Sequence, residues 1–326
     1  MTTETEPTIR EIREAAGRIR PHAHRTPVLT CAGLDDMTGA RLFFKCENFQ
    51  KVGAFKFRGA CNAVMSLTDA EAARGVATHS SGNHAAALAL AARLRGTVAH
   101  VVMPRTAPRV KRDAVAGYGA RIVPCEPTLV SREETLAKVI DETGAEVIHP
   151  YNDYRVIAGQ GTAALELLED HPGLDVVMAP VGGGGLMSGT CLAAVSLSPR
   201  TRLVGAEPEG ADDAFRSLAE GRIVPSVDPR TVADGLLTSL GEKTFPILRR
   251  CLERIVTAGD AAILEALRHV LQRMKIVVEP SAVVTLAALL EKKIDVRGLN
   301  VGIILTGGNV DLAALGASIA RATPGP

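Results

Sequence analysis

The feature that most constrains this chain is the repeated alternation of short β-branched runs with longer helical patterns. The runs that have the character of strands are "RLFFKCE", "GVATHS", "TVAHVVMP", "RIVPCE", "LDVVMAPV", "TRLVGAEPE" and "NVGIILTGG". Strands that alternate with helices in this way predict parallel sheets covered by helices on both faces. The sequence therefore predicts an α/β fold with open, mostly parallel, twisted sheets.

The spacing of these units indicates two domains. Residues 76–147 hold three compact strand–helix units and are expected to form a small domain. Residues 1–75 and 148–326 are expected to form a larger domain from both ends of the chain. Because no Gly/Ser-rich linker separates them, the two domains should share a tight interface. Near the start, Thr8 and Glu11 form a T-x-x-E capping box that predicts the first helix.

Composition limits the partners and the compartment of the protein. A formal net charge of +1 argues against nucleic acid or an anionic membrane surface as the main partner. The polar N-terminal segment is unlike a signal peptide, and the apolar runs are too short to span a bilayer. The six cysteines have neither C-x-x-C nor zinc-finger spacing. We therefore expect a cytoplasmic protein whose cysteines are mostly small core residues.

The segment "APVGGGGLMSG" follows a buried strand and precedes an apolar helix. In such folds ligands bind beyond the carboxyl ends of the strands. The amides of Gly182–Gly185 lack side chains that would screen them, which suits a phosphate. The segment matches neither the G-x-G-x-x-G fingerprint nor the Walker A pattern, so a dinucleotide or ATP site is disfavoured. The alternative is a glycine turn that serves only tight packing.

Two further strand ends carry polar groups. In "THSSGNHAAALA" the hydroxyls of Ser80 and Ser81 stand beside Asn83 and His84, where a helix begins. This arrangement can bind a carboxylate, although Ser81 could instead be an ordinary helix cap and His84 a structural histidine. In "IILTGGNVD" the hydroxyl of Thr306 ends the last strand before two glycines.

One lysine has an unusual setting. In "GAFKFRGA", Lys56 stands between two phenylalanines in a mostly apolar segment. It is either a surface residue of an ordinary helix or an amine held in a pocket. In a partly dry pocket the pKa of a lysine falls, so that its amine can attack an aldehyde and later accept a proton.

Together these segments resemble the fold-type II pyridoxal-phosphate enzymes. The resemblance is to the serine/threonine dehydratase and serine racemase family, which includes threo-3-hydroxyaspartate dehydratases. The motifs occur in order along nearly the whole chain: "ENFQKVGAFKFRGA", "SSGNH", "HPYNDYRVIAGQGT", "GGGGLMSG", "EPEGADDA", "VEPSA" and "TGGN". The resemblance implies two open sheets of the tryptophan synthase β type.

The resemblance also implies the roles of individual residues. Lys56 corresponds to the lysine that is covalently joined to the aldehyde of pyridoxal 5'-phosphate. The other implied cofactor-binding residues are Phe55, Asn83, Gly182, Gly183, Gly184, Gly185, Leu186, Gly235, Glu279 and Thr306. The implied substrate-binding residues are Ser80, Ser81, Asn83, His84 and Arg132.

The implied reaction is β-elimination of water from a β-hydroxy amino acid, which gives a keto acid and ammonia. Lys56 would take the α-proton as general base. Ser81 stands where many biosynthetic threonine dehydratases carry alanine and the racemases carry serine, so the alternative is predominantly a serine or aspartate racemase. Arg132 matches an arginine that approaches acidic substrates, which adds threo-3-hydroxyaspartate to serine and threonine. Otherwise Arg132 is a solvated helix residue.

The family's divalent-cation site is matched by Glu207, the carbonyl of Ala211, and Asp213. Oxygen ligands at this spacing suit Mg²⁺, Ca²⁺ or Mn²⁺, and the alternative is an acidic helix start. Val52 and Ala86 stand where animal racemases carry the threonine and glutamine of a nucleotide site. Because Tyr118 and Asn309 are retained, activation by ATP stays open. A homodimer is expected from the resemblance alone.

Three other functions are disfavoured. A β-replacing synthase of the cysteine type usually carries "TSGNTG" where this chain has "SSGNHA". A non-catalytic binding or scaffold protein on the same fold is disfavoured by the retained Lys56, Ser81, Asn83 and Thr306. A nicotinamide oxidoreductase is suggested only by the α/β pattern, and the absent glycine fingerprint counts against it.

Overall fold

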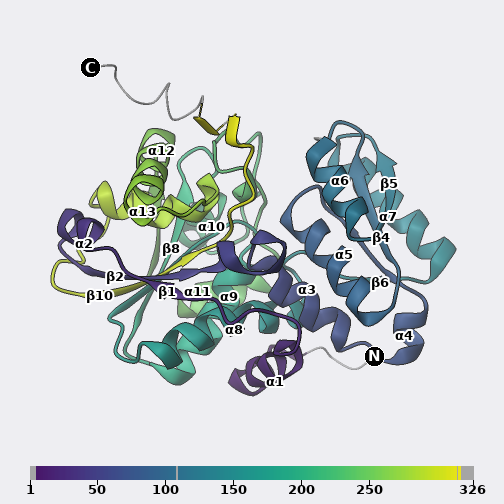
Figure 1. Cartoon of the computed structure of the whole chain (residues 1–326), viewed down its shortest axis with the longest axis horizontal. Helices are drawn as coiled ribbons and strands as arrows, with labels where there is room; N and C mark the ends of the chain where they lie inside the picture. Colours follow the sequence, from purple (N-terminus) through teal and green to yellow (C-terminus); the bar gives the residue numbers. More distant parts are fainter. Residues whose placement is uncertain (1–4, 108, 314, 317–326) are drawn as a thin grey trace.

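The structure of the protein is a computed structural model that describes residues 5–107, 109–313, 315 and 316. Two sheets lie side by side, each with its own set of helices (Figure 1). The larger sheet takes its strands from both ends of the chain, whereas all strands of the smaller sheet lie between residues 76 and 147. The predicted fold class is confirmed, and the limits of the two domains stay a prediction.

The larger sheet has the strand order β1-β2-β10-β7-β8-β9. Its strands pair in parallel, except that the edge strand β1 is antiparallel to β2. The short β1 and the strand β9 were not among the predicted strands. The bounds are β1 (Val28–Leu29), β2 (Arg41–Cys46), β7 (Val176–Pro180), β8 (Arg202–Pro208), β9 (Arg254–Ala258) and β10 (Asn300–Leu305).

The smaller sheet has the order β5-β4-β3-β6, and all its pairs are parallel. Three of its strands were predicted from their β-branched runs, and the two-residue β6 was too short to give a pattern. The bounds are β3 (Val76–His79), β4 (Ala99–Pro104), β5 (Arg121–Cys125) and β6 (Glu146–Val147).

The helices connect successive strands and cover the sheets. The predicted capping box is present at α1. The side chain of Thr8 accepts a hydrogen bond from the backbone amide of Glu11, and the side chain of Glu11 accepts one from the backbone amide of Thr8. The α-helices are α1 (Ile9–Ile19), α2 (Ala32–Thr38), α3 (Lys56–Met65), α4 (Asp69–Ala73), α5 (Asn83–Arg95), α6 (Arg109–Gly117), α7 (Leu129–Thr143), α8 (Tyr154–Asp170), α9 (Gly185–Leu197), α10 (Asp213–Glu220), α11 (Thr244–Cys251), α12 (Asp260–His269) and α13 (Val284–Leu290). The shorter helices are η1 (Glu47–Phe49), η2 (Lys51–Gly53), η3 (Asp234–Leu236), η4 (Val270–Met274) and η5 (Pro280–Val283).

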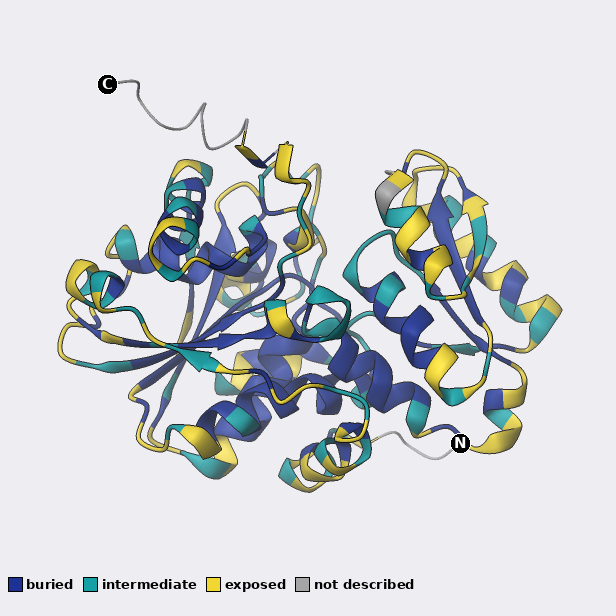
Figure 2. Cartoon of the chain, viewed as in Figure 1, coloured by how far each residue is buried: buried dark blue, intermediate teal, exposed yellow. Residues whose placement is uncertain are grey.

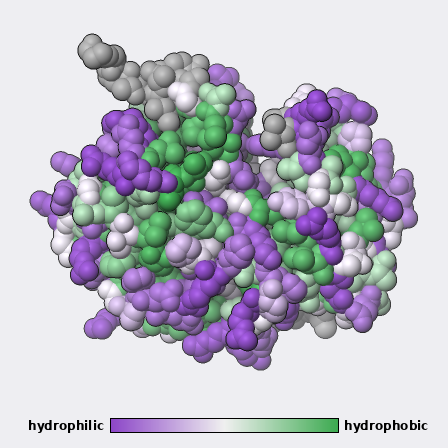
Figure 3. All heavy atoms as spheres, in the orientation of Figure 1, coloured by the Kyte–Doolittle hydropathy of each residue, from purple (hydrophilic) through white to green (hydrophobic). Residues whose placement is uncertain are grey.

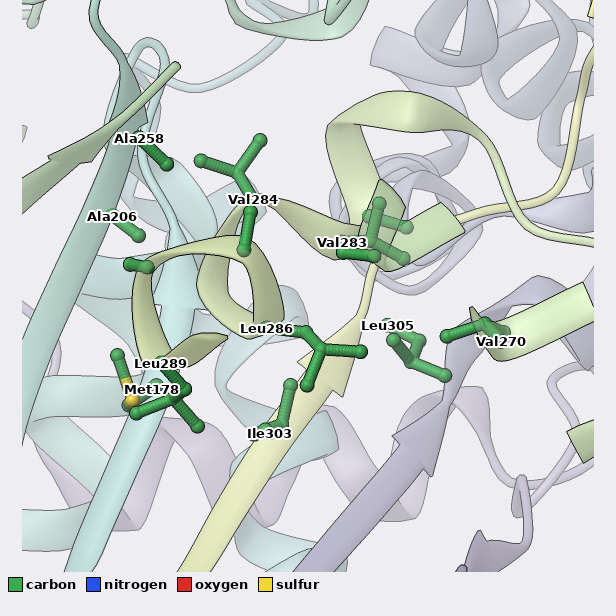
Figure 4. Close-up of a cluster of buried hydrophobic side chains, with 14 of the residues drawn as sticks. Met178, Ala206, Ala258, Val270, Val283, Val284, Leu286, Leu289, Ile303 and Leu305 are labelled. Carbon is green, nitrogen blue, oxygen red and sulfur yellow. The ribbon is translucent and has the colours of Figure 1, made fainter. Parts of the chain in front are cut away.

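Strand β7 shows how the larger sheet is buried on both faces. Val176 and Met178 belong to a core that includes α12 and α13 (Figure 4). Val177 and Ala179 belong to a second core, which includes α1, α8, α9 and α11. Successive side chains of a strand point to opposite faces, so both faces need apolar residues. The ribbon in Figure 2 is accordingly buried along the strands and exposed on the outer sides of the helices.

The surface is hydrophilic over much of the face in Figure 3, and it is hollowed between the larger and the smaller part of the molecule. Among the described residues, no helix combines the length and the apolar character needed to cross a membrane. The carboxyl ends of β2, β7 and β10 lie at one edge of the larger sheet, since these strands are parallel. The segments that follow them meet the segment after β3 to form the site.

Candidate active site

Lys56 is the first residue of α3 and is half-buried. The backbone before it is fixed to the end of β10, because the amide of Phe55 donates to the carbonyl of Thr306 over 3.0 Å. The Lys56 Nζ donates to the carbonyl oxygen of Pro150 over 2.9 Å and lies 5.1 Å from the centroid of the Phe55 ring. Burial lowers the pKa of Lys56 to about 8, although Glu279 opposes this shift. The uncharged, nucleophilic amine is therefore far more abundant near neutral pH than in an ordinary lysine.

The loop before Lys56 has an unusual backbone. Val52 has a φ of +57°, in the left-handed region that β-branched residues rarely adopt. Its carbonyl oxygen accepts a 2.7 Å hydrogen bond from Nδ2 of Asn309, which also donates to Oδ1 of Asn83 over 2.9 Å. One amide side chain thus connects the loop that leads to Lys56 with the first residue of α5. The sequence pattern indicates Asn309 only as part of a nucleotide site and does not predict this role.

The run Gly182–Gly185 lies between β7 and α9 and is buried. A Cβ on Gly183 would lie 2.3 Å from the Tyr151 ring, and Gly184 has a φ of +87°. Tight packing is therefore one reason for these glycines. Within the described chain, no hydrogen-bond acceptor is found for the amides of Gly182, Gly183 and Gly184, and the first-turn amides of a helix have no partner inside it. The free amides are a second reason, because they fit a phosphate.

Tyr151 is a site residue that the sequence analysis missed, although it lies in the quoted motif "HPYNDYRVIAGQGT". Its ring covers Gly183 and meets the His149 ring edge to face, with the two centroids 4.6 Å apart. The Nδ1 of His149 accepts from the amides of Tyr151 and Asn152, over 3.3 and 2.9 Å. Burial lowers the pKa of His149 to about 4, so its proton is on Nε2 at neutral pH.

The turn Ser80–His84 follows β3, as predicted. The N-cap of α5 is Gly82, which has no side-chain cap, so the alternative that Ser81 caps the helix is wrong. The Nε2 of His84 lies 3.0 Å from the carbonyl oxygen of Ile148 and must donate to it, while Nδ1 is buried and has no partner among the residues that the structure describes. Burial lowers the pKa of His84 to about 3, so the imidazole is neutral. In this state Nδ1 has no proton to donate to a carboxylate.

Two oxygen-bearing side chains of the site, those of Thr306 and Glu279, come from segments beside the larger sheet. The hydroxyl of Thr306 is buried and has no hydrogen-bond partner within the residues described. Asn83 donates through Nδ2 to both carboxylate oxygens of Glu279, over 3.1 Å each. Burial raises the pKa of Glu279 to about 7. The other implied residues, Leu186 and Gly235, lie beside the tetraglycine run: Leu186 is the second residue of α9, and the Gly235 carbonyl would lie 3.4 Å from a Cβ on Gly182.

Arg132 lies in the first turn of α7, over the carboxyl edge of the smaller sheet. Burial lowers the pKa of His79, and the charge of Arg132 lowers it further. His79 ends β3 and immediately precedes Ser80, so Arg132 is close to the predicted carboxylate site. Its Nε is buried and has no hydrogen-bond partner in the described part of the protein. The alternative of a fully solvated arginine is therefore disfavoured.

The predicted cation site lies at the end of β8. Glu207 is buried and accepts the amides of Ala214 and Phe215 over 3.1 and 2.7 Å. Both carboxylate oxygens of Asp213 are buried, and no partner is found for them in the described residues. Burial raises the pKa of Asp213 to about 6 and that of Glu207 well above its usual range. No group of three or more Asp, Glu, His or Cys side chains suited to a metal exists in the described residues, so carbonyls such as that of Ala211 would be needed.

The residues present fit pyridoxal phosphate. The amine of Lys56 suits its aldehyde. The amides of Gly182–Gly184 suit its phosphate and the hydroxyl of Thr306 suits its ring nitrogen, since none of these groups has a hydrogen-bond partner among the described residues. These groups come from three segments that only the fold brings together. The fold and the site thus define an enzyme that carries this cofactor on a lysine.

The chain belongs to the family of pyridoxal-phosphate dependent enzymes, whose model matches residues 19–307. It is 55% identical over 309 residues to the β-hydroxyaspartate dehydratase of Paracoccus denitrificans (strain Pd 1222), which covers 95% of this chain and 98% of that protein. It is 50% identical over 314 residues to the serine racemase of Arabidopsis thaliana, with 94% of each chain covered. The solved structure of maize serine racemase has a TM-score of 0.93 and 46% identity, and covers 97% of this chain and 98% of that one. The predictions of the family, the fold type and an enzyme are confirmed.

Proposed function

We propose that the chain is an ammonia-lyase that removes water from β-hydroxy amino acids, with threo-3-hydroxyaspartate among its substrates. Serine and threonine are the smaller substrates of the same site. The observation that carries this proposal is the half-buried amine of Lys56, whose pKa is lowered to about 8. Its near relation to a β-hydroxyaspartate dehydratase and to a serine racemase supports the same reaction class.

When bound, pyridoxal phosphate supplies an electron sink for the bond that breaks at the substrate's Cα. The free amine of Lys56 removes the α-proton, and its lowered pKa matches this task at neutral pH. Phe55 and Pro150 keep the amine in place through the ring contact and the 2.9 Å hydrogen bond. Loss of the β-hydroxyl follows, and hydrolysis of the product gives a keto acid and ammonia.

The neutral hydroxyl of Thr306 affects the outcome. A hydroxyl cannot hold a proton on the ring nitrogen as a carboxylate would. This limits the spread of negative charge and favours prompt loss of the β-substituent. Glu279 is a carboxylate in the same region, and it accepts hydrogen bonds from Asn83.

Substrate binding uses the turn after β3. Ser80 and Ser81, with the first-turn amides of α5, receive the α-carboxylate, and Asn83 orients the cofactor ring. Arg132 receives the second carboxylate of hydroxyaspartate, because its Nε is buried near this turn and has no hydrogen-bond partner in the described part of the chain. His84 is one of the predicted carboxylate ligands. While its imidazole is neutral, it helps to shape the site but donates no hydrogen bond to the carboxylate.

The second candidate function is racemisation of serine or aspartate. It requires a group that exchanges a proton on the face of the substrate opposite Lys56. Ser81 is half-buried and is not used as a helix cap, which leaves its hydroxyl available for that task. A divalent cation at Glu207, Ala211 and Asp213 would offset the two buried carboxylates. A homodimer and a cytoplasmic location also belong to this proposal.

One substrate panel tests the proposal. Serine, threonine and both threo-3-hydroxyaspartates are supplied to the purified enzyme, and keto acid, ammonia and enantiomer are measured. Lys56→Ala should abolish all turnover. Arg132→Ala should raise KM for hydroxyaspartate far more than for serine, whereas the exposed Arg105→Ala serves as a control. If Arg132→Ala leaves hydroxyaspartate turnover intact, that substrate assignment fails. Ser81→Ala should remove racemisation and keep elimination.

A further inference from the structure

The turn of residues 149–152, between β6 and α8, contacts both chemical parts of the site. The carbonyl oxygen of Pro150 accepts the 2.9 Å hydrogen bond of the Lys56 amine. The Tyr151 ring packs so closely against the tetraglycine run that a Cβ on Gly183 would lie 2.3 Å from it. One turn thus touches the predicted reactive amine and the predicted phosphate site. A change in its backbone would therefore move both contacts together.

The backbone of this turn is held by the side chain of its first residue. The Nδ1 of His149 accepts hydrogen bonds from the amides of Tyr151 and Asn152, over 3.3 and 2.9 Å. The side chain of Asn152 is bound as well, because its Oδ1 accepts from the amide of Lys243 over 2.8 Å. A side-chain acceptor that binds the amides two and three residues further on fixes a turn locally. Loss of this acceptor would leave two amides of the turn without the bonds that define its shape.

The orientation of the His149 imidazole is itself fixed by two other rings. Its centroid lies 4.6 Å from that of Tyr151 and 6.3 Å from that of His79, and the rings are nearly perpendicular in both pairs, at 90° and 88°. Edge-to-face contacts of this kind favour one setting of the ring. They therefore also fix the direction in which Nδ1 accepts. A histidine that only filled space would need no acceptor at this atom.

We propose that His149 is a positioning residue, which places the Lys56 amine and shapes the tetraglycine run through the turn that it holds. It acts through the Pro150 carbonyl and the Tyr151 ring, and it neither takes nor gives a proton in the reaction. In its kinetic part this inference rests on the proposed function. A shift of about 1 Å at a reacting group can cost on the order of a hundredfold in rate, so a loosened turn should lower kcat. The turn contains none of the predicted carboxylate ligands, so KM should change little.

The test compares His149→Asn with His149→Gln. In the first variant the new Oδ1 can take the place of Nδ1 as acceptor, whereas in the second the amide reaches only the place of Nε2. Both variants lose the ring, so the difference between them isolates the acceptor. Hydrogen exchange of the Tyr151 and Asn152 amides is measured in the full chain without cofactor. It should become roughly tenfold faster in His149→Gln and stay within about threefold of the wild type in His149→Asn. The control is His22→Gln, in the turn after α1.

The holoenzymes are then compared well below the melting temperature of each variant. His149→Gln should release pyridoxal phosphate roughly tenfold faster and lower kcat for the best substrate by a similar factor, with KM nearly unchanged. His149→Asn should restore both quantities. A lower melting temperature alone, with release and kcat unchanged, or an equal loss in both variants, would overturn the proposal. If the wild type forms no keto acid, the proposed function fails, whereas the exchange and release rates still decide the role of His149.

Discussion

Asn83 and Glu279 are joined by two 3.1 Å contacts, from one amide nitrogen to both carboxylate oxygens, although 196 residues separate them in the chain. Asn83 begins α5 beside the smaller sheet, and Glu279 precedes η5 beside the larger one. The contact therefore crosses between the two sheets next to Lys56. It also supplies hydrogen bonds to a buried carboxylate.

The first prediction concerns the pH dependence of Glu279. Its pKa of about 7 lies above the unfolded value, so the native state binds more protons than the unfolded state between about pH 4.5 and 7. Stability from this group is present below that window and is lost as the pH rises through it. In the apoprotein, the free energy of unfolding of Glu279→Gln relative to wild type should rise by about 2–3 kcal/mol between pH 5 and pH 8. Urea unfolding measures it, with the exposed Glu14→Gln as control; equal differences at both pH values would contradict it.

The second prediction concerns the amine of Lys56. Its lowered pKa means that the uncharged form appears near pH 8, whereas an ordinary lysine titrates near ~10.4. Reductive labelling of the apoprotein with a small aldehyde should modify Lys56 with a midpoint near pH 8. Mass mapping across a pH series follows each lysine separately. A Lys56 curve that coincides with that of the surface lysines would mean that the pocket does not lower its pKa.

The third prediction concerns the glycine run. In Gly183→Ala the new Cβ would lie 2.3 Å from the Tyr151 ring, so either the loop or the ring must move. We expect a loss of roughly 1–3 kcal/mol in the free energy of unfolding and weaker retention of the cofactor. The control is Gly17→Ala in α1, where nothing lies within 4 Å of the new Cβ. That change should stabilise the protein by about 0.5–1 kcal/mol. Similar effects at both glycines would argue against the close contact.

The fourth prediction concerns a buried ion network behind Lys56. Arg58 is fully buried and bonds Glu47 and Glu166, each over 2.7 Å, and Lys45 bonds Glu166 over 2.6 Å. Removing one charge leaves the others uncompensated in a dry environment. Arg58→Met should therefore cost about 3–5 kcal/mol of unfolding free energy. The exposed Arg10→Met should change the unfolding midpoint little. If the two variants unfold alike, the network contributes nothing.

The fifth prediction concerns the divalent cation. Calcium, magnesium or manganese should raise the melting temperature of the wild type, by an amount equivalent to about 2.7 kcal/mol at 100 times the dissociation constant. The effect should fade as the pH drops through about 6, because Asp213 then takes up a proton. Asp213→Asn should lose the effect, and the neighbouring Asp212→Asn, at a residue paired with Arg216, should keep it. If none of the three ions changes the melting temperature, the prediction of a cation site is wrong.

Some of the missed features were too short or too remote to leave a local pattern. The strand β6 has two residues, and β9 is a five-residue run at the edge of its sheet. Tyr151 lies in a quoted motif, but its place against Gly183 depends on how α8 packs on α9. Asn309 reaches Val52 across 257 residues of sequence. The hydrophobic periodicity of a sequence carries no information about contacts between residues so far apart.

The sequence by itself determined the α/β class, and it predicted the tetraglycine run as a phosphate site and, through the resemblance of its motifs, Lys56 as the reactive amine. It could do so because hydrophobic period, glycine freedom and residue chemistry are local properties. Only the tertiary structure decided that His84 is neutral and that Ser81 does not cap α5. These outcomes depend on burial and on contacts between distant segments, and both arise only when the chain has packed.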